Sequence, residues 1–150
     1  MKIIGIDPGL SGAIAVLENN KVINIFDIPV MSEGKKNKRQ LNSALLVNLL
    51  KENIGKNEEV VVFVEQVNAM PGQGVTSMFN FGQSFGVLKG VCSAMNLSMY
   101  FVRPAKWKKY FNLINTEKDA SRTKAIEIFP YFSINLSKKK DANKADAMLI

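Results

Sequence analysis

Three acidic residues occupy positions from which they can combine into one chemical site. Asp7 ends a short β-branched run at the turn Ile-Asp-Pro-Gly, Glu65 ends a second apolar run, and Asp146 lies in an apolar stretch near residue 150. Carboxylate oxygens at such positions favour hard divalent cations such as Mg²⁺. Two ions about 3.5–4 Å apart can hold the attacking water and the leaving oxygen in phosphodiester hydrolysis. The sequence has no histidine and one cysteine, which excludes a zinc site.

Each acid also has an ordinary structural interpretation. Asp7 can cap the turn that Pro8 and Gly9 form, and Glu65 can be a solvated acid at the end of a strand. Asp146 is harder to explain in this way, because an acid on a largely buried helix face is costly unless it is paired or bound to a metal. The hypothesis of a single site therefore depends on the three acids together.

The charge of the chain indicates a polyanionic partner. It carries 20 lysines and arginines against 13 acids, a net charge of +7, and such an excess is attracted to a phosphate backbone. Two alternatives stay open: a charge that serves only solubility, and an anionic membrane surface. The second is less favoured because the basic residues do not follow an amphipathic helix. Nucleic acid is the predicted partner.

Basic and aromatic side chains gather in a few segments that are candidates for DNA contacts. Segment 31–39 is predicted to be a mobile basic loop, and segment 106–110 combines charge with stacking surfaces. Within the latter, Trp107 and Phe111 are four residues apart, which favours a role as core anchors, with the lysines then on the outward face. The predicted DNA-binding residues are Lys36, Lys38, Arg39, Met70, Gln73, Phe79, Phe81, Lys106, Lys109, Arg122, Lys139 and Lys140.

The elements that must position these residues follow a mixed α/β pattern. The apolar patterns predict an antiparallel meander of three strands, a buried strand covered by helices on both faces, and one more strand. The strand ranges are 2–7, 12–17, 22–28, 60–65 and 98–102. Helices are expected at 41–52, 76–96, 104–111, 118–129 and at the end of the sequence. In helix 76–96 a glycine at every fourth position permits close approach of another backbone, so tight packing is expected there.

The length and composition favour one domain, residues 1–150, with one hydrophobic core. No apolar run approaches the roughly 18 residues that span a bilayer, and the first apolar run is too short for a signal peptide. We therefore expect no membrane partner. A single cysteine excludes an intrachain disulfide and fits a reducing compartment. The expected location is the cytoplasm, of a bacterium or of a phage-infected host, with an organellar matrix as the alternative.

Four motifs, in order along almost the whole chain, resemble the RuvC-type Holliday junction resolvases. They are Ile4-Gly-Ile-Asp-Pro-Gly-Leu10 with Gly12-Ala-Ile-Ala15, then Val64-Glu-Gln-Val67, Phe81-Gly-Gln-Ser-Phe-Gly86 and Ala145-Asp-Ala147. Two further segments, 69–74 and 103–108, are similar to the phage and organellar branch of that family. The resemblance implies an α/β ribonuclease H-like fold, with a mixed five-stranded sheet flanked by helices.

The resemblance also implies a function and a set of roles. The activity would be resolution of four-way DNA junctions by symmetric paired nicks, catalysed by a homodimer joined through helix 76–96. Asp7, Glu65 and Asp146 would bind two Mg²⁺ ions per site, which Mn²⁺ can replace. Lys108 and Lys118 would lie near the cleaved phosphate.

The sequence departs from the family pattern next to the last aspartate. The family places a fourth ligand, Asp or His, three or four residues before it, where this chain has Asn143 and Ala142. Those two positions lie within about 60° of Asp146 on a helix, whereas Asp141 lies about 140° away. Asp141 can contribute only from a non-helical or capping conformation. Either the metal site is weakened, or Asp141 and Asn143 complete it.

A second departure affects the opening of a junction. Some relatives place an aromatic residue three positions after the glutamate, where this chain has Asn68. Junction opening would then fall to Met70, Phe79 or Phe81.

Three other functions share features with this sequence. An actin-like kinase also begins with a strand, an Asp and a glycine turn, but it needs a second domain that 150 residues do not hold. A YqgF-like ribonuclease shares the first motif and stays open. So does a module that binds branched DNA without cutting it, because of Ala142 and Asn143.

Overall fold

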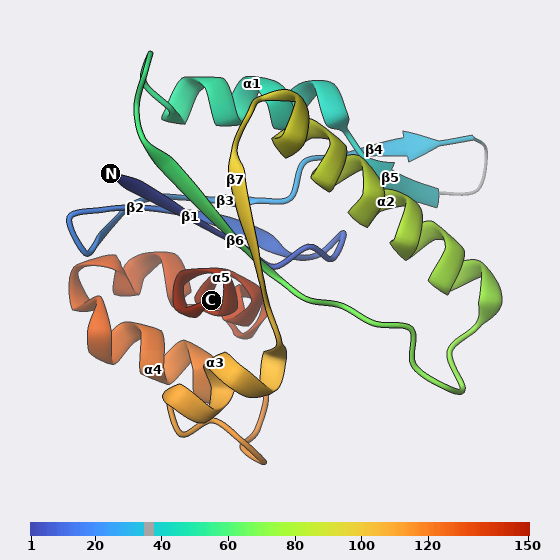
Figure 1. Ribbon diagram of the computed structural model, residues 1–150. Helices are drawn as coiled ribbons and strands as arrows, with labels where there is room; N and C mark the ends of the chain where they lie inside the picture. Colours follow the sequence, from blue (N-terminus) through green and yellow to red (C-terminus); the bar gives the residue numbers. More distant parts are fainter. Residues whose placement is uncertain (35–37) are drawn as a thin grey trace.

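The computed structural model describes residues 1–34 and 38–150, and its centre is a mixed five-stranded sheet (Figure 1). The strand order is β3-β2-β1-β6-β7; β1, β2 and β3 are antiparallel, whereas β1, β6 and β7 run parallel. The strands are β1 Lys2–Ile6, β2 Ala13–Glu18, β3 Lys21–Asp27, β6 Val60–Glu65 and β7 Ser98–Val102. The predicted sheet and its meander are confirmed.

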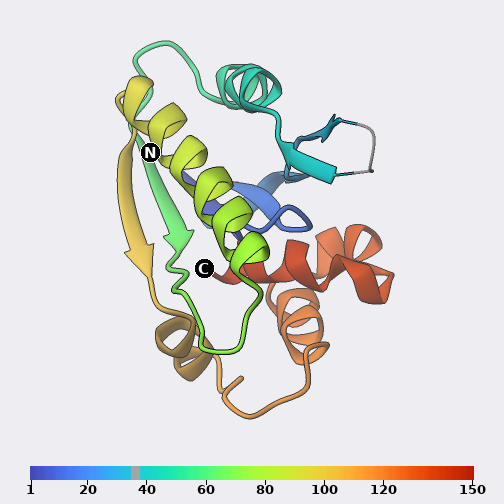
Figure 2. The same cartoon turned by 90° about the vertical axis from the view of Figure 1, so that its right-hand side faces the viewer.

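Helices cover both faces of the sheet, so the molecule has three layers (Figures 1 and 2). On one face lie α1 Ser43–Asn53 and α2 Val75–Ala94; on the other lie α3 Pro104–Tyr110, α4 Ala120–Ile128 and α5 Ala142–Leu149. Two 3₁₀ helices, η1 Pro130–Leu136 and η2 Lys139–Asp141, connect α4 to α5. Predicted helix 118–129 thus begins two residues later, and Lys118 lies in the turn before it. In the described part of the chain, no helix has the length and apolar character needed to cross a membrane.

Each layer of helices encloses its own hydrophobic core. Leu46 and Leu50 of α1 and Leu88 of α2 pack on Ile4 and Val62 of the sheet. The second core lies on the opposite face and contains Trp107, Ala125, Leu136, Ala145 and Met148. Alternate strand residues therefore face different helix layers, as the period of two in a strand requires.

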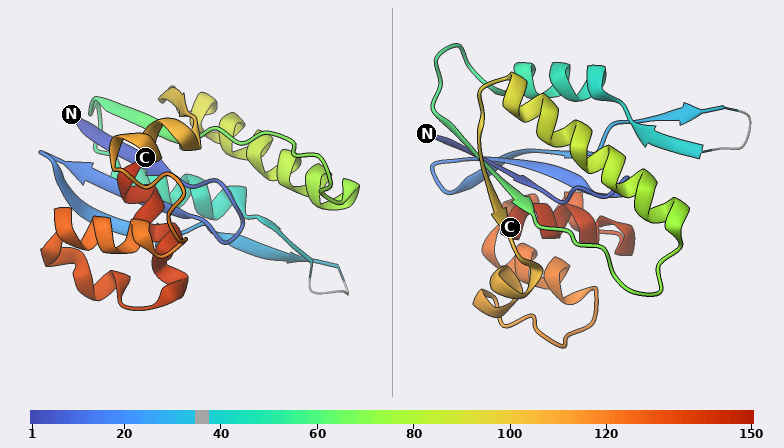
Figure 3. Two further views of the ribbon diagram at one scale, coloured as in Figure 1. Left: turned by 90° about the horizontal axis from the view of Figure 1, so that it is seen from below. Right: turned by 45° about the vertical axis from the view of Figure 1, so that its right-hand side comes forward.

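A two-stranded hairpin projects from the body of the protein (Figures 1 and 3). It pairs β4 Val30–Glu33 with β5 Lys38–Leu41 in antiparallel register, from Val30 opposite Leu41 to Glu33 opposite Lys38. The prediction of a mobile basic loop over 31–39 is therefore wrong for the described part of this segment. Lys36 lies outside the described residues.

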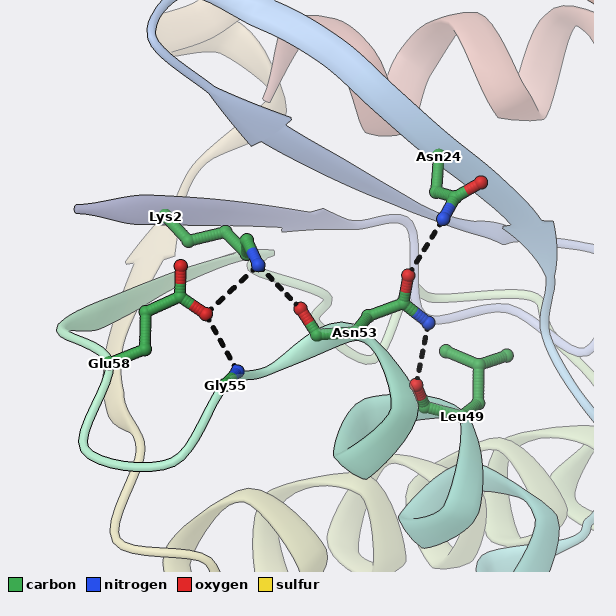
Figure 4. A network of polar contacts seen from close by, with 6 residues as sticks. All are labelled: Lys2, Asn24, Leu49, Asn53, Gly55 and Glu58. Carbon is green, nitrogen blue, oxygen red and sulfur yellow. Dashed lines mark hydrogen bonds and ion pairs between the residues drawn. The ribbon is translucent and has the colours of Figure 1, made fainter.

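A polar network fixes the end of the sheet that lies opposite Asp7 (Figure 4). The Lys2 ammonium donates to the Asn53 carbonyl at 2.8 Å and pairs with the Glu58 carboxylate at 2.9 Å. Asn24 donates to the Asn53 side chain at 2.8 Å, which connects β3 to the end of α1. The Gly55 backbone N–H, and then Lys2, hold the pKa of Glu58 below its usual value. The start of β1 is thus attached to the loop between α1 and β6.

Candidate active site

Strand register places Asp7 and Glu65 side by side. In the parallel pairing of β1 with β6, Ile6 lies opposite Val64, so the next residues along both strands are Asp7 and Glu65. Ile6 and Val64 face the core under α1 and α2. Because strand side chains alternate, the two acids face the other layer, where α5 lies. Two of the three predicted acids thus meet at the carboxyl edge of adjacent parallel strands.

Helix α5 brings Asp146 to the same place because its backbone lies directly against β1. A Cβ on Gly5 would collide with the Ala147 carbonyl, so only glycine permits this approach. A Cβ on Gly12 would likewise collide with the Asp7 carbonyl, which explains the tight turn after the first acid. These contacts at Gly5 and Gly12 set the distance between the helix, the turn and the strand edge.

The three carboxylates interact electrostatically. Burial is the largest cause that raises the pKa of Asp7, to about 7, and repulsion by Glu65 and then by Asp146 raises it further. Burial also raises the pKa of Glu65, as does Asp146. The pKa of Asp146 is raised by burial against the opposing effect of a hydrogen bond from Ser121. Three partly buried acids therefore share a negative potential that a cation would neutralise.

The chemistry of this donor set fits a hard cation, since all three donors are carboxylate oxygens. Nevertheless, across residues 1–34 and 38–150 no three acidic, cysteine or histidine side chains stand close enough together to hold a metal ion. The acids thus influence one another without forming a closed coordination shell.

Two lysines and a tryptophan border the acids. Lys108 opposes the raised pKa values of Glu65 and Asp146, and Lys118 opposes those of Asp7 and Asp146. A cavity of about 300 Å³ is lined by Asp146, Lys108 and Lys118 together with Trp107 and Ser121. Both lysines expected near the cleaved phosphate thus lie beside the carboxylates.

The Ser121 hydroxyl has two acceptors within reach. The Lys118 carbonyl lies at 3.4 Å, a long hydrogen bond, and the Asp146 carboxylate is the second acceptor. A hydroxyl has one proton, and a charged acceptor forms the stronger bond. The Ser121 hydroxyl thus lies close enough to Asp146 to lower the pKa of that carboxyl. The sequence alone does not indicate that a serine at the start of α4 would contact Asp146.

The structure does not bring Asp141 to the three acids. Its buried carboxylate accepts hydrogen bonds from the Lys138 backbone N–H at 2.9 Å and from the Lys144 ammonium at 3.3 Å. Burial alone would raise the pKa of Asp141, but these donors outweigh it and hold the pKa below its usual value. The Asn143 amide donates to the Ser11 carbonyl at 2.6 Å. Both residues predicted to complete the metal site therefore have other partners.

Basic residues from the hairpin and from η2 converge on a second cavity of about 660 Å³. Arg39, Lys139 and Lys140 line it, and Lys118 lines both this cavity and the one at Asp146. Arg122 lies elsewhere: its guanidinium binds both carboxylate oxygens of Asp119 at 2.8 Å and the Leu136 carbonyl at 2.9 Å. The structure thus gives Arg122 a structural role. Lys38, Lys106 and Lys109 are exposed.

Helix α2 is mostly apolar but buries little of its surface. Only Ser84, Leu88 and Cys92 are buried in it, while Phe79 is 71% exposed. A Cβ at any of the three glycines of α2 would meet nothing within 4 Å, so the expected tight packing does not occur within the described chain. Met70 and Gln73 are exposed in the loop before α2, and Phe81 stacks on Phe85 with ring centroids 6.3 Å apart.

Trp107 is only 3% exposed, so it offers no stacking surface to DNA. Its indole N–H donates to Glu65 Oε1 at 3.1 Å, and the Lys108 ammonium lies 5.4 Å from the ring centroid. The alternative of a core anchor is confirmed by its place in the second core. The bond to Glu65 was not predicted, since residues 42 positions apart show no sequence relationship.

Comparison with known proteins shows the fold. No family model matches the chain, and no curated protein matches it. Solved structures do match it. Among them are Thermus thermophilus RuvC in complex with a Holliday junction substrate, with TM-score 0.64, 16% identity and coverage of 100% of this chain and 89% of that one, and the Thermus thermophilus RuvC structure, with TM-score 0.54, 17% identity and coverage of 99% and 92%. The predicted ribonuclease H-like fold is confirmed.

Proposed function

We propose that this protein is a metal-dependent endonuclease that resolves four-way DNA junctions. The observation that carries the proposal is the convergence of Asp7, Glu65 and Asp146 at one sheet edge, between Lys108 and Lys118. The solved structure of a RuvC protein of similar fold holds a Holliday junction substrate. The motifs at 69–74 and 103–108 support the phage or organellar branch of that family. Residues 1–150 would form one nuclease domain.

The three carboxylates would hold two Mg²⁺ or Mn²⁺ ions, which activate the attacking water and stabilise the leaving oxygen. Asp7 and Glu65 contribute from adjacent strand ends, and Asp146 contributes from α5. Trp107 and Ser121 orient two of the carboxylates by hydrogen bonds. Lys108 and Lys118 neutralise negative charge at the phosphate, because they are the cations next to the acids.

The larger basic cavity supports a path for the DNA backbone away from the acids. Lys118 is common to both cavities, and Arg39, Lys139 and Lys140 continue the positive charge beyond it. Such cations position a duplex through its phosphates without reading its sequence. A DNA strand would enter at the hairpin and η2 and reach the carboxylates beside Lys118.

The apolar face of α2 supports a two-fold homodimer. Phe79 and Val75 are 71% and 85% exposed, which is unusual for apolar side chains on one helix. The open space around its glycines permits another backbone to approach closely. A two-fold contact would duplicate the acidic site, as two symmetric cuts require.

Two alternative functions keep specific support. A module that binds branched DNA without cutting it is favoured by the partners of Asp141 and Asn143 and by the open arrangement of the acids. A YqgF-like ribonuclease is compatible with the same fold and the same first motif.

One experiment separates the three functions. The protein is incubated with a labelled four-way junction, a linear duplex of the same sequence, and a structured RNA, each with Mg²⁺, with Mn²⁺ and with EDTA. Metal-dependent cleavage of the junction in preference to both other substrates supports the proposal. Junction binding without cleavage in either metal selects the binding module, and preferential cleavage of RNA selects the ribonuclease.

A further inference from the structure

Trp107 connects the hydrophobic core to the acidic site. It is the only tryptophan in the chain and is 3% exposed on α3. Neighbours in the second core, such as Ala145 and Leu113, hold its ring in place. From this position the indole N–H donates to Glu65 Oε1 at 3.1 Å. A rigid group inside the core thus reaches a carboxylate at the sheet edge.

The carboxylate of Glu65 needs such a contact. Its side chain is only partly buried, and Asp146 repels it. In the described chain, Trp107 is the one hydrogen-bond donor to Glu65. A flexible glutamate without that bond would be pushed away from the other acids.

The chemistry of the indole suits this task better than that of other donors. Its N–H only donates, so it neither titrates nor competes with Glu65 as a ligand, whereas a histidine can do both. The ammonium of Lys108 also lies over the Trp107 ring, 5.4 Å from its centroid, in a cation–π contact. One side chain thereby places an acid and a cation on the same edge of the site.

We propose that Trp107 is a positioning residue that holds the Glu65 carboxylate in place for metal binding, through its indole N–H and not through its bulk. This inference rests on the proposed function, because it assumes a cation at the three acids. Groups that orient metal ligands typically change metal affinity by about 10- to 100-fold when they are removed.

The single tryptophan permits a test of the N–H alone. Expression in a tryptophan auxotroph supplied with 3-benzothienylalanine replaces only residue 107, and in this analogue sulfur takes the place of the N–H while the ring size is kept. Trp107→Phe removes the same donor with a natural residue. Phe129→Leu is the matched control, since Phe129 lies in the same core but does not line the cavity at Asp146.

Binding of Mn²⁺ to the full chain, without DNA, is measured from the electron paramagnetic resonance signal of the free ion. We expect affinity about 10- to 100-fold weaker with the analogue and with Trp107→Phe, and little change with Phe129→Leu. Unchanged affinity with the analogue would overturn the inference, and so would an equal loss in Phe129→Leu. If the unmodified protein binds no Mn²⁺, the metal centre of the proposed function fails together with the inference. If the unmodified protein binds Mn²⁺ and the analogue leaves the affinity unchanged, only the inference is overturned.

Discussion

Replacing Asp7 with asparagine should stabilise the metal-free protein while it abolishes function. Asp7 is partly buried at the point where it faces Glu65 and Asp146, and its pKa is raised from 3.8 to about 7. Asparagine has nearly the same shape, and its side-chain oxygen can still accept the hydrogen bond from the Gly9 backbone that Asp7 receives. The substitution therefore removes the charge and keeps the contacts.

The size of the effect follows from the pKa. A pKa raised from 3.8 to about 7 means that ionised Asp7 costs the folded state up to about 4 kcal/mol, since each tenfold change in the ionisation constant corresponds to about 1.36 kcal/mol. Because the folded pKa is the higher one, this cost is fully present above pH 7, shrinks as the pH falls from 7 towards 3.8, and disappears below 3.8, where the acid is protonated in both states. We expect Asp7→Asn to raise the free energy of unfolding by about 2–4 kcal/mol at pH 8 and to leave it almost unchanged near pH 4.

The assay is urea unfolding in EDTA between pH 4 and pH 8, with Glu52→Gln as the control. Glu52 is exposed on α1, so its substitution should change the unfolding free energy by less than about 0.5 kcal/mol. An Asp7→Asn variant that is less stable than the parent at pH 8 would refute the reasoning. A gain in unfolding free energy that is the same at every pH would refute it too.

Three other predictions concern the acids, the dimer and the position of the fourth ligand. Asp146→Asn should reduce junction cleavage at least about 100-fold, since a lost ligand costs more than a lost orienting group; a gel-shift assay should show binding unchanged or tighter. Phe79→Asp should weaken dimerisation about tenfold or more, whereas Ile134→Asp, at a position 82% exposed on η1, should not; sedimentation that shows equal association in both would contradict the interface on α2. Asn143→Asp should increase the affinity for Mg²⁺ in calorimetry, because it adds a carboxylate one turn before Asp146.

The sheet was predictable because its signals are local. The runs that became β1, β2, β3, β6 and β7 are short, apolar and bounded by turn residues, and the position of Asp7 before Pro-Gly follows from the same pattern. The hairpin was not predictable, since β4 and β5 have four residues each and are mostly polar and exposed. The pairing of β4 with β5 depends on contacts that no periodic pattern of apolar residues in the sequence indicates.

The site was predictable only in part, for a related reason. Strand ends and a family pattern pointed to Glu65 and Asp146, but the partners that orient them come from distant elements. Trp107 is a core residue by its spacing, and its second role appears only when α3 packs beside β6. Asp141 and Asn143 lie near Asp146 in sequence, yet hydrogen bonds direct their side chains elsewhere: that of Asp141 to the nearby Lys138, and that of Asn143 to Ser11, far away in the sequence.

The central claim is tested most directly by mapping the nicks in a four-way junction. Each strand is end-labelled in turn, the full-length protein is added with Mg²⁺, and the cut positions are read at nucleotide resolution beside Asp146→Asn. The account predicts paired nicks at symmetry-related positions in two opposite strands, absent in EDTA and in the variant. Cuts in one strand only, cuts that a linear duplex receives equally, or cleavage that persists in Asp146→Asn would contradict it.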